Sequence, residues 1–310
     1  MSLVIGNHVH KEGSNFADAI KRDVEMAKGC GMHMNAAQIF VIGPRNSKQN
    51  ITDADCIALK KMTDNGFKIV THGSYLTNPW GAKSAFGIML ARQELELCDK
   101  FGGAGLIIHL ARVPPETIAA AIPKIFAGSK PAADGTIVYT KSMLWLEIES
   151  YTADEHTYED NIKISKLLDE LRKVLSEEEF ARIGICLDTA HMWAAGVDIS
   201  DYDSASTYMR KMRMLEVPLM IHLNDQIWAI GQGRDEHAPL GYGTIWNKYR
   251  IDGNLEESGL YAFLEYAYND DIMLILERKA DQPKINGLPA IDNRRSDYIV
   301  VGKLGFGGTV

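Results

Sequence analysis

Short apolar runs rich in β-branched residues recur along the chain, and longer stretches with helical periodicity separate them. The runs predict eight strands, at Leu3–Val9, Ala37–Ile42, Lys68–His72, Gly105–His109, Met143–Ile148, Ile183–Asp188, Pro218–His222 and Ile272–Glu277. The stretches between them predict helices, among them Asn15–Gly29, Asp53–Asn65, Ala85–Phe101, Asp160–Leu175 and Ser258–Tyr268. Strands that alternate with helices are typical of a parallel sheet with crossover connections. We therefore expect an α/β protein.

Eight strands match a closed (β/α)₈ TIM barrel, and an open doubly wound sheet is the alternative. A length of 310 residues is ordinary for one such barrel, and the 46% hydrophobic fraction is enough for a large core. No repeat or linker divides the chain, so residues 1–310 are predicted to form a single TIM-barrel domain. Gly128–Thr140 is expected to be a surface excursion, and the pattern after Glu277 is too irregular to place a helix.

Charge and cysteine content narrow the choice of function and compartment only a little. The net charge of −8 lacks the basic footprint of most nucleic-acid-binding proteins. Three bound divalent cations would reduce it to −2 at one face, so DNA is not excluded as a partner. The chain has no apolar run of 18 residues, no secretory signal pattern and no CxxC among its four cysteines. We expect free thiols and a cytoplasmic location, without a membrane partner.

Histidines and carboxylates lie at the ends of six consecutive predicted strands or in the loops that follow. These residues are His72, His109, Glu147, Asp188, His191, His222, Asp235, His237 and Glu277. The carboxyl ends of all strands of a TIM barrel meet at one mouth, where active sites are found. Imidazoles and carboxylates are ligands that zinc prefers, and several carboxylates this close together repel one another unless cations are present. The set predicts a site for several metal ions at the strand carboxyl ends.

Each of these residues also has an ordinary structural explanation. A single histidine at a strand end is commonly a hydrogen-bonded structural residue, and a single glutamate there is commonly a cap. Independent structural roles rarely place such residues at six successive strand ends. The sequence also lacks a GxGxxG after a strand, a P-loop, a GxSxG elbow and a convincing Cys–His nucleophile pair. Metal-assisted chemistry is the interpretation that remains.

Two long segments, CLDTAHMWAAGVD and HLNDQIWAIGQGRDEHAPLGYG, resemble the endonuclease IV family of apurinic/apyrimidinic (AP) endonucleases. The similarity extends from GNHV near the amino terminus to LILE at Glu277. It implies a TIM barrel with three zinc ions at the strand carboxyl ends, with manganese as an option at one site. It also implies three ligand sets: His72, His109 and Glu147 for the first ion, Glu147, Asp188, His222 and Glu277 for the second, and His191, Asp235 and His237 for the third.

The resemblance further implies an activity and a partner. Family members cleave duplex DNA on the 5′ side of abasic sites in base-excision repair, leaving a 3′-hydroxyl and a 5′-deoxyribose phosphate. Glu147 and Glu277 would be the catalytic carboxylates, and Arg45 and Tyr75 match positions that enter the duplex. We expect a monomer, from either a bacterium or a cytoplasmic DNA virus.

Departures from the family pattern occur beside the predicted ligands. Leu110-Ala111 replaces a usual Pro-Gly, Ile148-Glu149 replaces Asn-Thr, and Glu236 replaces an arginine. The last change exchanges a cation that favours phosphate for an anion. One alternative function is a metal-dependent sugar isomerase or epimerase on the same barrel, which needs one or two metals and has no use for the third set. The other alternative is a binding protein without catalytic activity, which has no reason to retain nine ligands.

Overall fold

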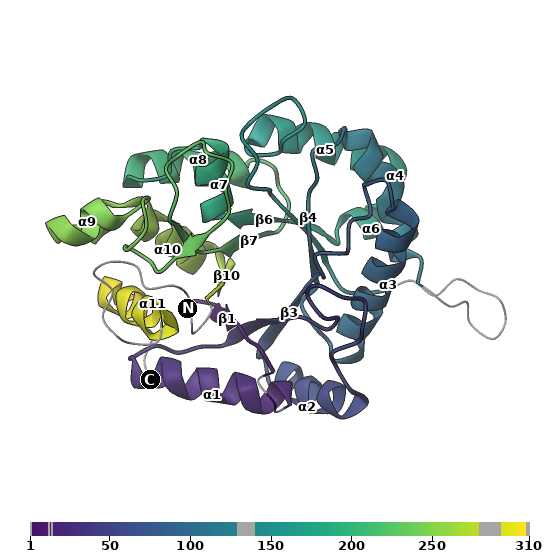
Figure 1. Ribbon diagram of the computed structural model, residues 1–310, viewed down its shortest axis with the longest axis horizontal. Coiled ribbons are helices and arrows are strands. Elements are labelled where there is room, and N and C mark those ends of the chain that lie inside the picture. Colours follow the sequence, from purple (N-terminus) through teal and green to yellow (C-terminus); the bar gives the residue numbers. More distant parts are fainter. Residues whose placement is uncertain (1, 12, 14, 129–139, 279–292, 308–310) are drawn as a thin grey trace.

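The computed structural model describes residues 2–11, 13, 15–128, 140–278 and 293–307. Eight parallel strands close into a barrel in these residues (Figure 1). Around the barrel they are β1 (Ile5–His8), β2 (Ala36–Ile39), β3 (Lys68–His72), β4 (Leu106–His109), β5 (Leu144–Glu147), β6 (Ile183–Asp188), β7 (Leu219–His222) and β10 (Met273–Leu276). Because β10 pairs with β1 in parallel register, the sheet has no open edge. The predicted TIM barrel is confirmed, with all eight strands, and the open sheet is excluded.

Helices form an outer ring around the strands (Figure 1). They are α1 (Phe16–Gly29), α2 (Asp53–Asp64), α3 (Ser84–Lys100), α4 (Pro115–Phe126), α5 (Asn161–Val174), α6 (Glu177–Phe180), α7 (Thr189–Ala195), α8 (Tyr202–Arg213), α9 (Asn247–Asp252), α10 (Gly259–Asp270) and α11 (Asn293–Val301), with the short 3₁₀-helix η1 (Leu255–Glu257) and the short π-helix η2 (Gly302–Phe306). The helix α11 is the element that the sequence could not place. The predicted excursion at 128–140 lies, apart from its two end residues, outside the described residues.

Capping residues explain where three of the predicted helices begin. Asn15 and Asp160, the predicted first residues of α1 and α5, keep an extended backbone and accept hydrogen bonds from amides in the first turn. Each residue is therefore an N-cap, and its helix begins one position later. Thr52 and Asp55 form a reciprocal capping box at the start of α2. The predicted helices agree with the structure to within two residues at each end.

The core has two parts because side chains on a strand alternate between the two faces of the sheet. Outward side chains and the helices form the larger apolar cluster. Inward side chains close the floor of the barrel, and they are Ala36, Val70, Ile107, Trp145, Cys186, Met220, Met273 and Ile275. The barrel interior is therefore apolar at the floor. Among the described residues, no helix combines the length and apolarity needed to cross a membrane.

Gly6 lies where β1 and β2 come too close for a side chain. A Cβ atom at this position would lie 1.9 Å from the carbonyl oxygen of Ala36, its partner on β2. We expect Gly6→Ala to lower the free energy of unfolding by about 3 kcal/mol or more, because the two strands must separate. Gly29→Ala is the control, since nothing lies within 4 Å of its Cβ, and it should change stability by at most about 1 kcal/mol. Urea unfolding followed by circular dichroism measures both, and equal stabilities would contradict the prediction.

Candidate metal centre

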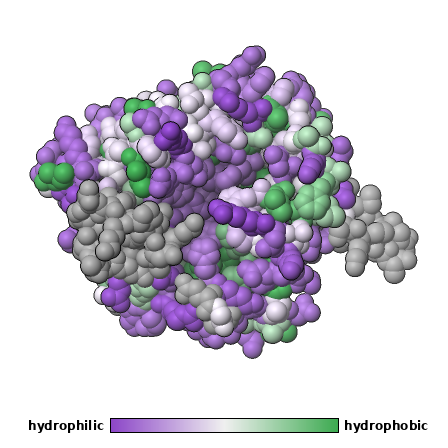
Figure 2. Space-filling view, viewed as in Figure 1, coloured by the Kyte–Doolittle hydropathy of each residue, from purple (hydrophilic) through white to green (hydrophobic). Residues whose placement is uncertain are grey.

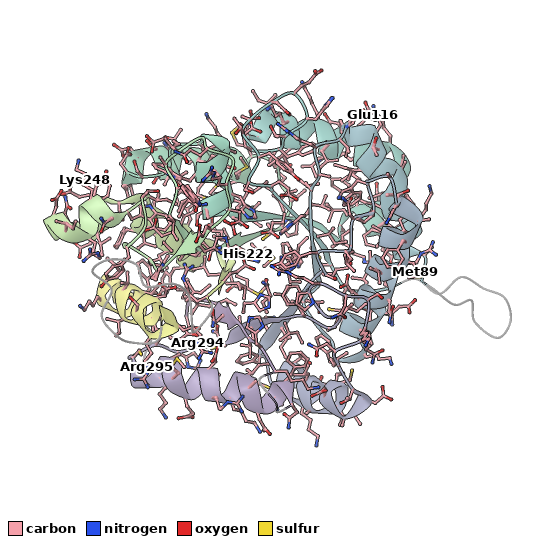
Figure 3. All side chains as sticks on the ribbon, in the orientation of Figure 1. Met89, Glu116, His222, Lys248, Arg294 and Arg295 are labelled. Carbon is pink, nitrogen blue, oxygen red and sulfur yellow. The ribbon has the colours of Figure 1, made fainter. Side chains whose placement is uncertain are left out.

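Six of the predicted ligands enter the barrel directly above its apolar floor. Each follows an inward floor residue by two positions, so strand alternation points it into the same interior. The pairs of floor residue and upper residue are Val70 and His72, Ile107 and His109, Trp145 and Glu147, Cys186 and Asp188, Met220 and His222, and Ile275 and Glu277. His222 accordingly lies near the centre of the molecule in Figure 3. The strand period alone therefore places six ligands at one mouth.

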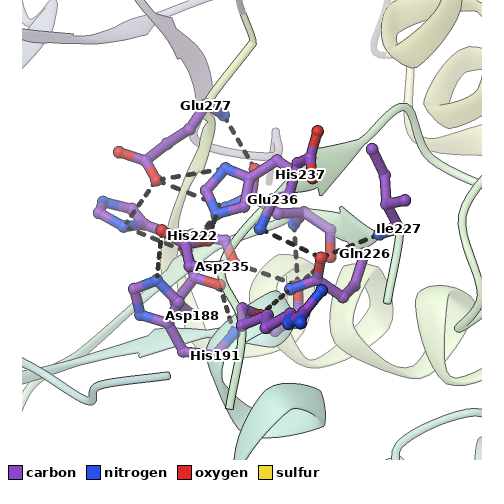
Figure 4. Close-up of polar contacts among 12 residues, drawn as sticks. Asp188, His191, His222, Gln226, Ile227, Asp235, Glu236, His237 and Glu277 are labelled. Atoms are coloured by element: carbon purple, nitrogen blue, oxygen red, sulfur yellow. Dashed lines mark hydrogen bonds and ion pairs between the residues drawn. The ribbon is translucent and has the colours of Figure 1, made fainter. Parts of the chain in front are cut away.

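The other three predicted ligands come from the connections after β6 and β7. Asp188 is the N-cap of α7 and accepts a hydrogen bond from the amide of His191, which directs the first turn of this helix into the mouth. The sequence predicts a loop around Asp235 and His237, but the structure forms a short ladder there. The strand β9 (His237–Ala238) pairs antiparallel with β8 (Asp225–Gln226). In this ladder His237 lies beside Asp235 and Glu277 (Figure 4).

The first group of side chains consists of His72, His109 and Glu147. The Nε2 atoms of the two histidines lie 3.3 Å and 2.9 Å from Oε2 of Glu147. That carboxylate is fully buried, yet its Oε2 atom has no hydrogen bond. A buried carboxylate oxygen faced by two imidazole nitrogens without hydrogen-bond geometry fits a shared cation.

The second group shares Glu147 with the first and adds Asp188, His222 and Glu277. The Nδ1 atom of His222 lies 2.8 Å from Oε1 of Glu147, 3.4 Å from Oε2 of Glu277 and 3.7 Å from Oδ2 of Asp188. Three carboxylates thus surround one imidazole nitrogen. Such an arrangement needs positive charge to offset the repulsion among the carboxylates.

The third group lies closer to solvent and combines Asp188, His191 and His237 with Asp235. Asp235 is 45% exposed at the rim of the mouth. Its Oδ1 atom lies 3.0 Å from Nε2 of His237, and its Oδ2 atom lies 3.5 Å from Nε2 of His191. Figure 4 shows these side chains converging beside Glu277. All nine predicted side chains therefore come together at the mouth, although Asp188 rather than Asp235 completes the compact cluster with His191 and His237.

The ionisation of these groups is what a cation site requires. Burial disfavours the charged form of Glu147, but His109 and His222 outweigh it and hold the pKa of Glu147 well below its usual range. Burial likewise opposes protonation of His109, but the Glu147 carboxylate raises the pKa of His109 to about 9. Protons on imidazoles thus balance the buried carboxylates. A divalent cation would replace these protons, so its binding should release protons to solvent.

Two of the histidines have a backbone carbonyl as the hydrogen-bond partner of Nδ1. Nδ1 of His72 lies 2.8 Å from the carbonyl oxygen of Gly73, and Nδ1 of His191 lies 2.7 Å from that of Ile148. A carbonyl oxygen only accepts hydrogen bonds, so each Nδ1 carries the proton. In the neutral ring that a metal ion requires, the lone pair is then on Nε2, which faces Glu147 in His72 and Asp235 in His191.

The long motif after β7 also contains residues that shape the backbone. Asp225 is fully buried and accepts hydrogen bonds from the backbone amides of Gly241, Gly243 and Ile245. A Cβ atom on Gly243 would lie 2.3 Å from Oδ1 of Asp225, so glycine is required there. These contacts hold the segment that follows β9 against β8. They explain why the motif extends well beyond its ligands.

The two predicted DNA contacts lie side by side at the rim. Tyr75, on the β3–α3 loop, is 58% exposed, and Arg45 is exposed on the β2–α2 loop. Two hydrogen bonds join the loops. The backbone amide of Tyr75 donates to the carbonyl oxygen of Pro44, and the hydroxyl of Ser74 donates to the carbonyl oxygen of Gly43. Tyr75 also lines the pocket at the mouth, together with His237 and Glu277. Figure 2 shows hydrophilic residues around the central hollow of this face.

Comparison with known proteins connects this centre to a family. The family model described as "Xylose isomerase-like TIM barrel" matches residues 13–283. The chain is 36% identical to a "Probable AP endonuclease" of African swine fever virus, with 84% of each chain covered. It is 28% identical to a "Probable endonuclease 4" of Mycoplasmopsis pulmonis, covering 78% of this chain and 84% of the other. The chain belongs to the endonuclease IV family of AP endonucleases.

A solved structure has the same overall fold. The crystal structure of AsfvAP:AG superposes with a TM-score of 0.83 at 30% sequence identity, covering 98% of this chain and 99% of the other. The resemblance read from the two sequence motifs is therefore confirmed.

Three departures from the endonuclease IV pattern can now be located. Leu110 and Ile148 are buried, and the carbonyl of Ile148 accepts the hydrogen bond from His191. Glu149 lies on the rim, with its Oε1 atom 3.5 Å from Nδ1 of His109. Glu236 lines the pocket and accepts a hydrogen bond from the Trp228 indole. These changes leave the nine predicted ligand positions in place.

Sequence reasoning missed polar residues that contact the ligands. Asn224 lies two residues after His222. The side-chain Nδ2 of Asn224 is 2.7 Å from Oδ2 of Asp188, and its side-chain Oδ1 accepts a hydrogen bond from the backbone amide of Glu277. Gln38 bonds both His222 and Glu277. A signal for Gln38 exists in the sequence, because an uncharged amide interrupts the apolar run AAQIFVIG. That signal does not say which side chains the amide meets.

Glu94 supports the loop that carries Tyr75 and provides a test of pH dependence. Its carboxyl accepts hydrogen bonds from the amide of Ser74 and the hydroxyl of Thr77, yet burial dominates and raises the pKa of Glu94 to about 8. Since this folded-state pKa exceeds that of the unfolded chain, stability should fall as pH rises from about 5 through 8. Glu94→Gln should flatten this decline, measured as urea unfolding free energy against pH. Parallel profiles for the two proteins would contradict it.

Proposed function

We propose that this chain is a zinc-dependent DNA-repair endonuclease. It hydrolyses the phosphodiester on the 5′ side of abasic sites in duplex DNA, leaving a 3′-hydroxyl and a 5′-deoxyribose phosphate, in base-excision repair. The observation that carries this proposal is the third group of side chains, built from His191, Asp235 and His237 beside two groups that share Glu147. The names of the relatives support it.

Three zinc ions per chain fit the three groups, with manganese as an alternative at one of them. The proposed ligands are His72, His109 and Glu147 for the first ion, Glu147, Asp188, His222 and Glu277 for the second, and His191, Asp235 and His237 for the third. When bound, the ions would polarise the phosphodiester, offset charge on the departing oxygen and lower the pKa of a bound water to about 7.

Glu147 and Glu277 are the proposed catalytic carboxylates. Glu147 faces the first group with Oε2 and the second with Oε1, so this one side chain sets the spacing between the two groups. The side chain of Glu277 is 15% exposed, at the mouth, where it lines the pocket. Its position allows it to accept the proton that an attacking water loses. The carboxylates thus orient the nucleophile and receive its proton.

Arg45 and Tyr75 are the proposed contacts with duplex DNA. Their loops are hydrogen-bonded to each other, so both side chains would approach the same stretch of the duplex. An arginine can enter a minor groove, and an exposed aromatic ring can stack where a base is absent. The abasic nucleotide would then reach the pocket beneath Tyr75. We further propose that the protein acts as a monomer.

The ligand sets argue against a sugar isomerase or epimerase on this barrel. Such an enzyme needs one or two metals, which the first and second groups would hold. It has no role for a third group that combines His191, His237 and a rim carboxylate. Hydrolysis of a phosphodiester does use an additional cation, which stabilises the leaving oxygen.

Metal analysis and a cleavage assay on the purified protein test the proposal together. We expect close to three zinc, or zinc plus manganese, per chain. We also expect a single cut on the 5′ side of a tetrahydrofuran abasic analogue in duplex DNA, and no cut in the same duplex without the analogue. One metal or none, together with an uncut abasic duplex, would overturn the proposal.

Glu236 allows a separate test of the DNA-binding face. Replacing it with arginine exchanges an anion in the pocket lining for a cation, although the hydrogen bond from Trp228 is lost. We expect Glu236→Arg to bind the abasic duplex more tightly and to steepen the dependence of log affinity on log salt by about 1. Glu178→Arg, in α6 before β6, makes the same charge change at the opposite end of the barrel. Equal salt slopes for the two variants would contradict a DNA contact at Glu236.

A further inference from the structure

The ring of polar side chains above the barrel floor includes two residues without an assigned role. Gln38 on β2 follows the floor residue Ala36 by two positions, as the proposed ligands follow theirs. His8 occupies the corresponding place on β1. Gln38 is fully buried, and His8 is nearly so. Neither residue is one of the nine proposed metal ligands.

Gln38 connects three strands through its side-chain amide. Its Nε2 atom lies 2.6 Å from Oε1 of Glu277, the residue that follows β10, and 2.8 Å from Nδ1 of His8 on β1. Its Oε1 atom lies 2.8 Å from Nε2 of His222 on β7. The amide therefore contacts one proposed ligand through its nitrogen and another through its oxygen.

These contacts determine which way the amide faces. The carboxylate of Glu277 can only accept a hydrogen bond, so the amide atom beside it must be the NH₂ group. The carbonyl oxygen of Gln38 then faces His222, and it can only accept. Nε2 of His222 must carry the donated proton. Nδ1 of His222 lies 2.8 Å from Oε1 of Glu147 and shares a second proton with that carboxylate. A metal ion would replace this second proton, which leaves the remaining proton on Nε2 and the lone pair on Nδ1, the atom that faces Glu147, Asp188 and Glu277.

We propose that Gln38 is a positioning residue that holds His222 in the tautomer able to ligate the second metal ion through Nδ1. The inference rests on the proposed function, since it concerns one of the three metal groups. His72 and His191 obtain the opposite tautomer from backbone carbonyls, and they present Nε2. His222 is oriented by a side chain instead, which a substitution can remove without changing the backbone.

The amide of glutamine meets requirements that neither a carboxylate nor an apolar side chain meets. An ionised carboxylate at position 38 would lie against Glu277 and could not donate to it. A methionine would fill a similar volume but leave Nε2 of His222 buried without a partner. Gln38→Met therefore removes the hydrogen bonds with little change in packing.

The first measurement is zinc affinity by competition with a chelator. Loss of such an orienting hydrogen bond typically costs 10- to 100-fold in metal affinity. We expect Gln38→Met to weaken one of the three zinc ions by about 10- to 100-fold and to leave the other two within about threefold. Thermal unfolding of the zinc-free proteins checks that the variant folds. This readout does not depend on cleavage of DNA.

The second measurement is the tautomer of His222, by NMR of zinc-loaded protein labelled with ¹⁵N-histidine. We expect a slowly exchanging Nε2 proton on His222, assigned by its loss in His222→Asn, and we expect Gln38→Met to abolish the slow exchange. Gln226→Met is the matched control. It removes another fully buried glutamine amide, whose hydrogen bonds go to backbone atoms of residues 227–236. The His222 signal should persist in this control.

The outcomes separate this inference from the proposed function. The role of Gln38 alone would be overturned if NMR placed the proton of His222 on Nδ1 in the zinc-loaded natural protein. It would also be overturned if Gln38→Met left the zinc affinity unchanged. A natural protein that binds no zinc would overturn the proposed function and this inference with it. Selective weakening of one zinc ion, with loss of the protected Nε2 proton, supports the assignment.

Discussion

Replacing Glu147 with glutamine is expected to slow cleavage of an abasic-site duplex by about 10³-fold or more. The carboxylate faces His72 and His109 with one oxygen and His222 with the other, so it belongs to two proposed metal groups at once. A neutral amide is a weaker ligand and leaves the imidazoles without their anion. Zinc content should fall below two ions per chain. Single-turnover cleavage and metal analysis on the same sample measure both effects.

The control for this substitution must also change a buried glutamate. Glu94→Gln does so, because Glu94 is fully buried and contacts Ser74 and Thr77 rather than the proposed ligands. The raised pKa of Glu94 leaves it largely neutral at pH 7, where an amide is a close substitute. We expect this control to retain three zinc ions and cleavage within about tenfold of the natural rate. Equal activities of Glu147→Gln and the natural chain would rule out a catalytic role for Glu147.

Replacing His237 with alanine is expected to slow cleavage by about 10²- to 10³-fold while the barrel stays folded. His237 lies on the short strand β9, outside the barrel, so its loss leaves the core intact. Its Nε2 atom faces Asp235 at 3.0 Å and Asp188 at 3.8 Å. Without this imidazole the third group loses one of its nitrogen ligands. The charge on the departing 3′-oxygen would then be less well stabilised.

Metal content and thermal unfolding distinguish this effect from misfolding. We expect His237→Ala to lose one zinc ion and to keep the other two. His33→Ala is the control, because His33 is exposed and lies before β2, at the amino-terminal end of the barrel, and it should keep full activity. If His237→Ala cleaved the abasic duplex at the rate of the natural protein, a role of the third metal in the mechanism would be ruled out.

Much of the fold and most of the site could be predicted from local sequence pattern. Strand alternation is a local property with a period of two, and it already puts His72 above Val70 and Glu147 above Trp145. The eight barrel strands were predicted from short apolar runs rich in β-branched residues, and Asn15 and Asp160 marked helix starts because capping is also local. The grouping into three sets came from the family resemblance. The roles of these residues stay predictions until metal content and cleavage are measured.

The missed features depend on contacts between distant segments. The β8–β9 ladder joins Asp225 and Gln226 to His237 and Ala238 across the intervening loop. The amide of Gln38 meets Glu277 and His222 only because the barrel closes β1 between β2 and β10. The helix α11 is held from outside the barrel, where Asp297 accepts hydrogen bonds from Arg278 and from the amide of Leu240. No periodic pattern encodes such partners.

The sequence by itself determined which side chains face into the barrel and at which end, because side-chain direction on a strand follows from the two-residue repeat of the backbone. Only the tertiary structure decided which nitrogen of His72, His191 and His222 is available to a metal ion. That choice depends on the atom that meets the other nitrogen, a backbone carbonyl for His72 and His191 and the carbonyl oxygen of Gln38 for His222. These partners come together only when the barrel closes, because closure sets the distances across the mouth.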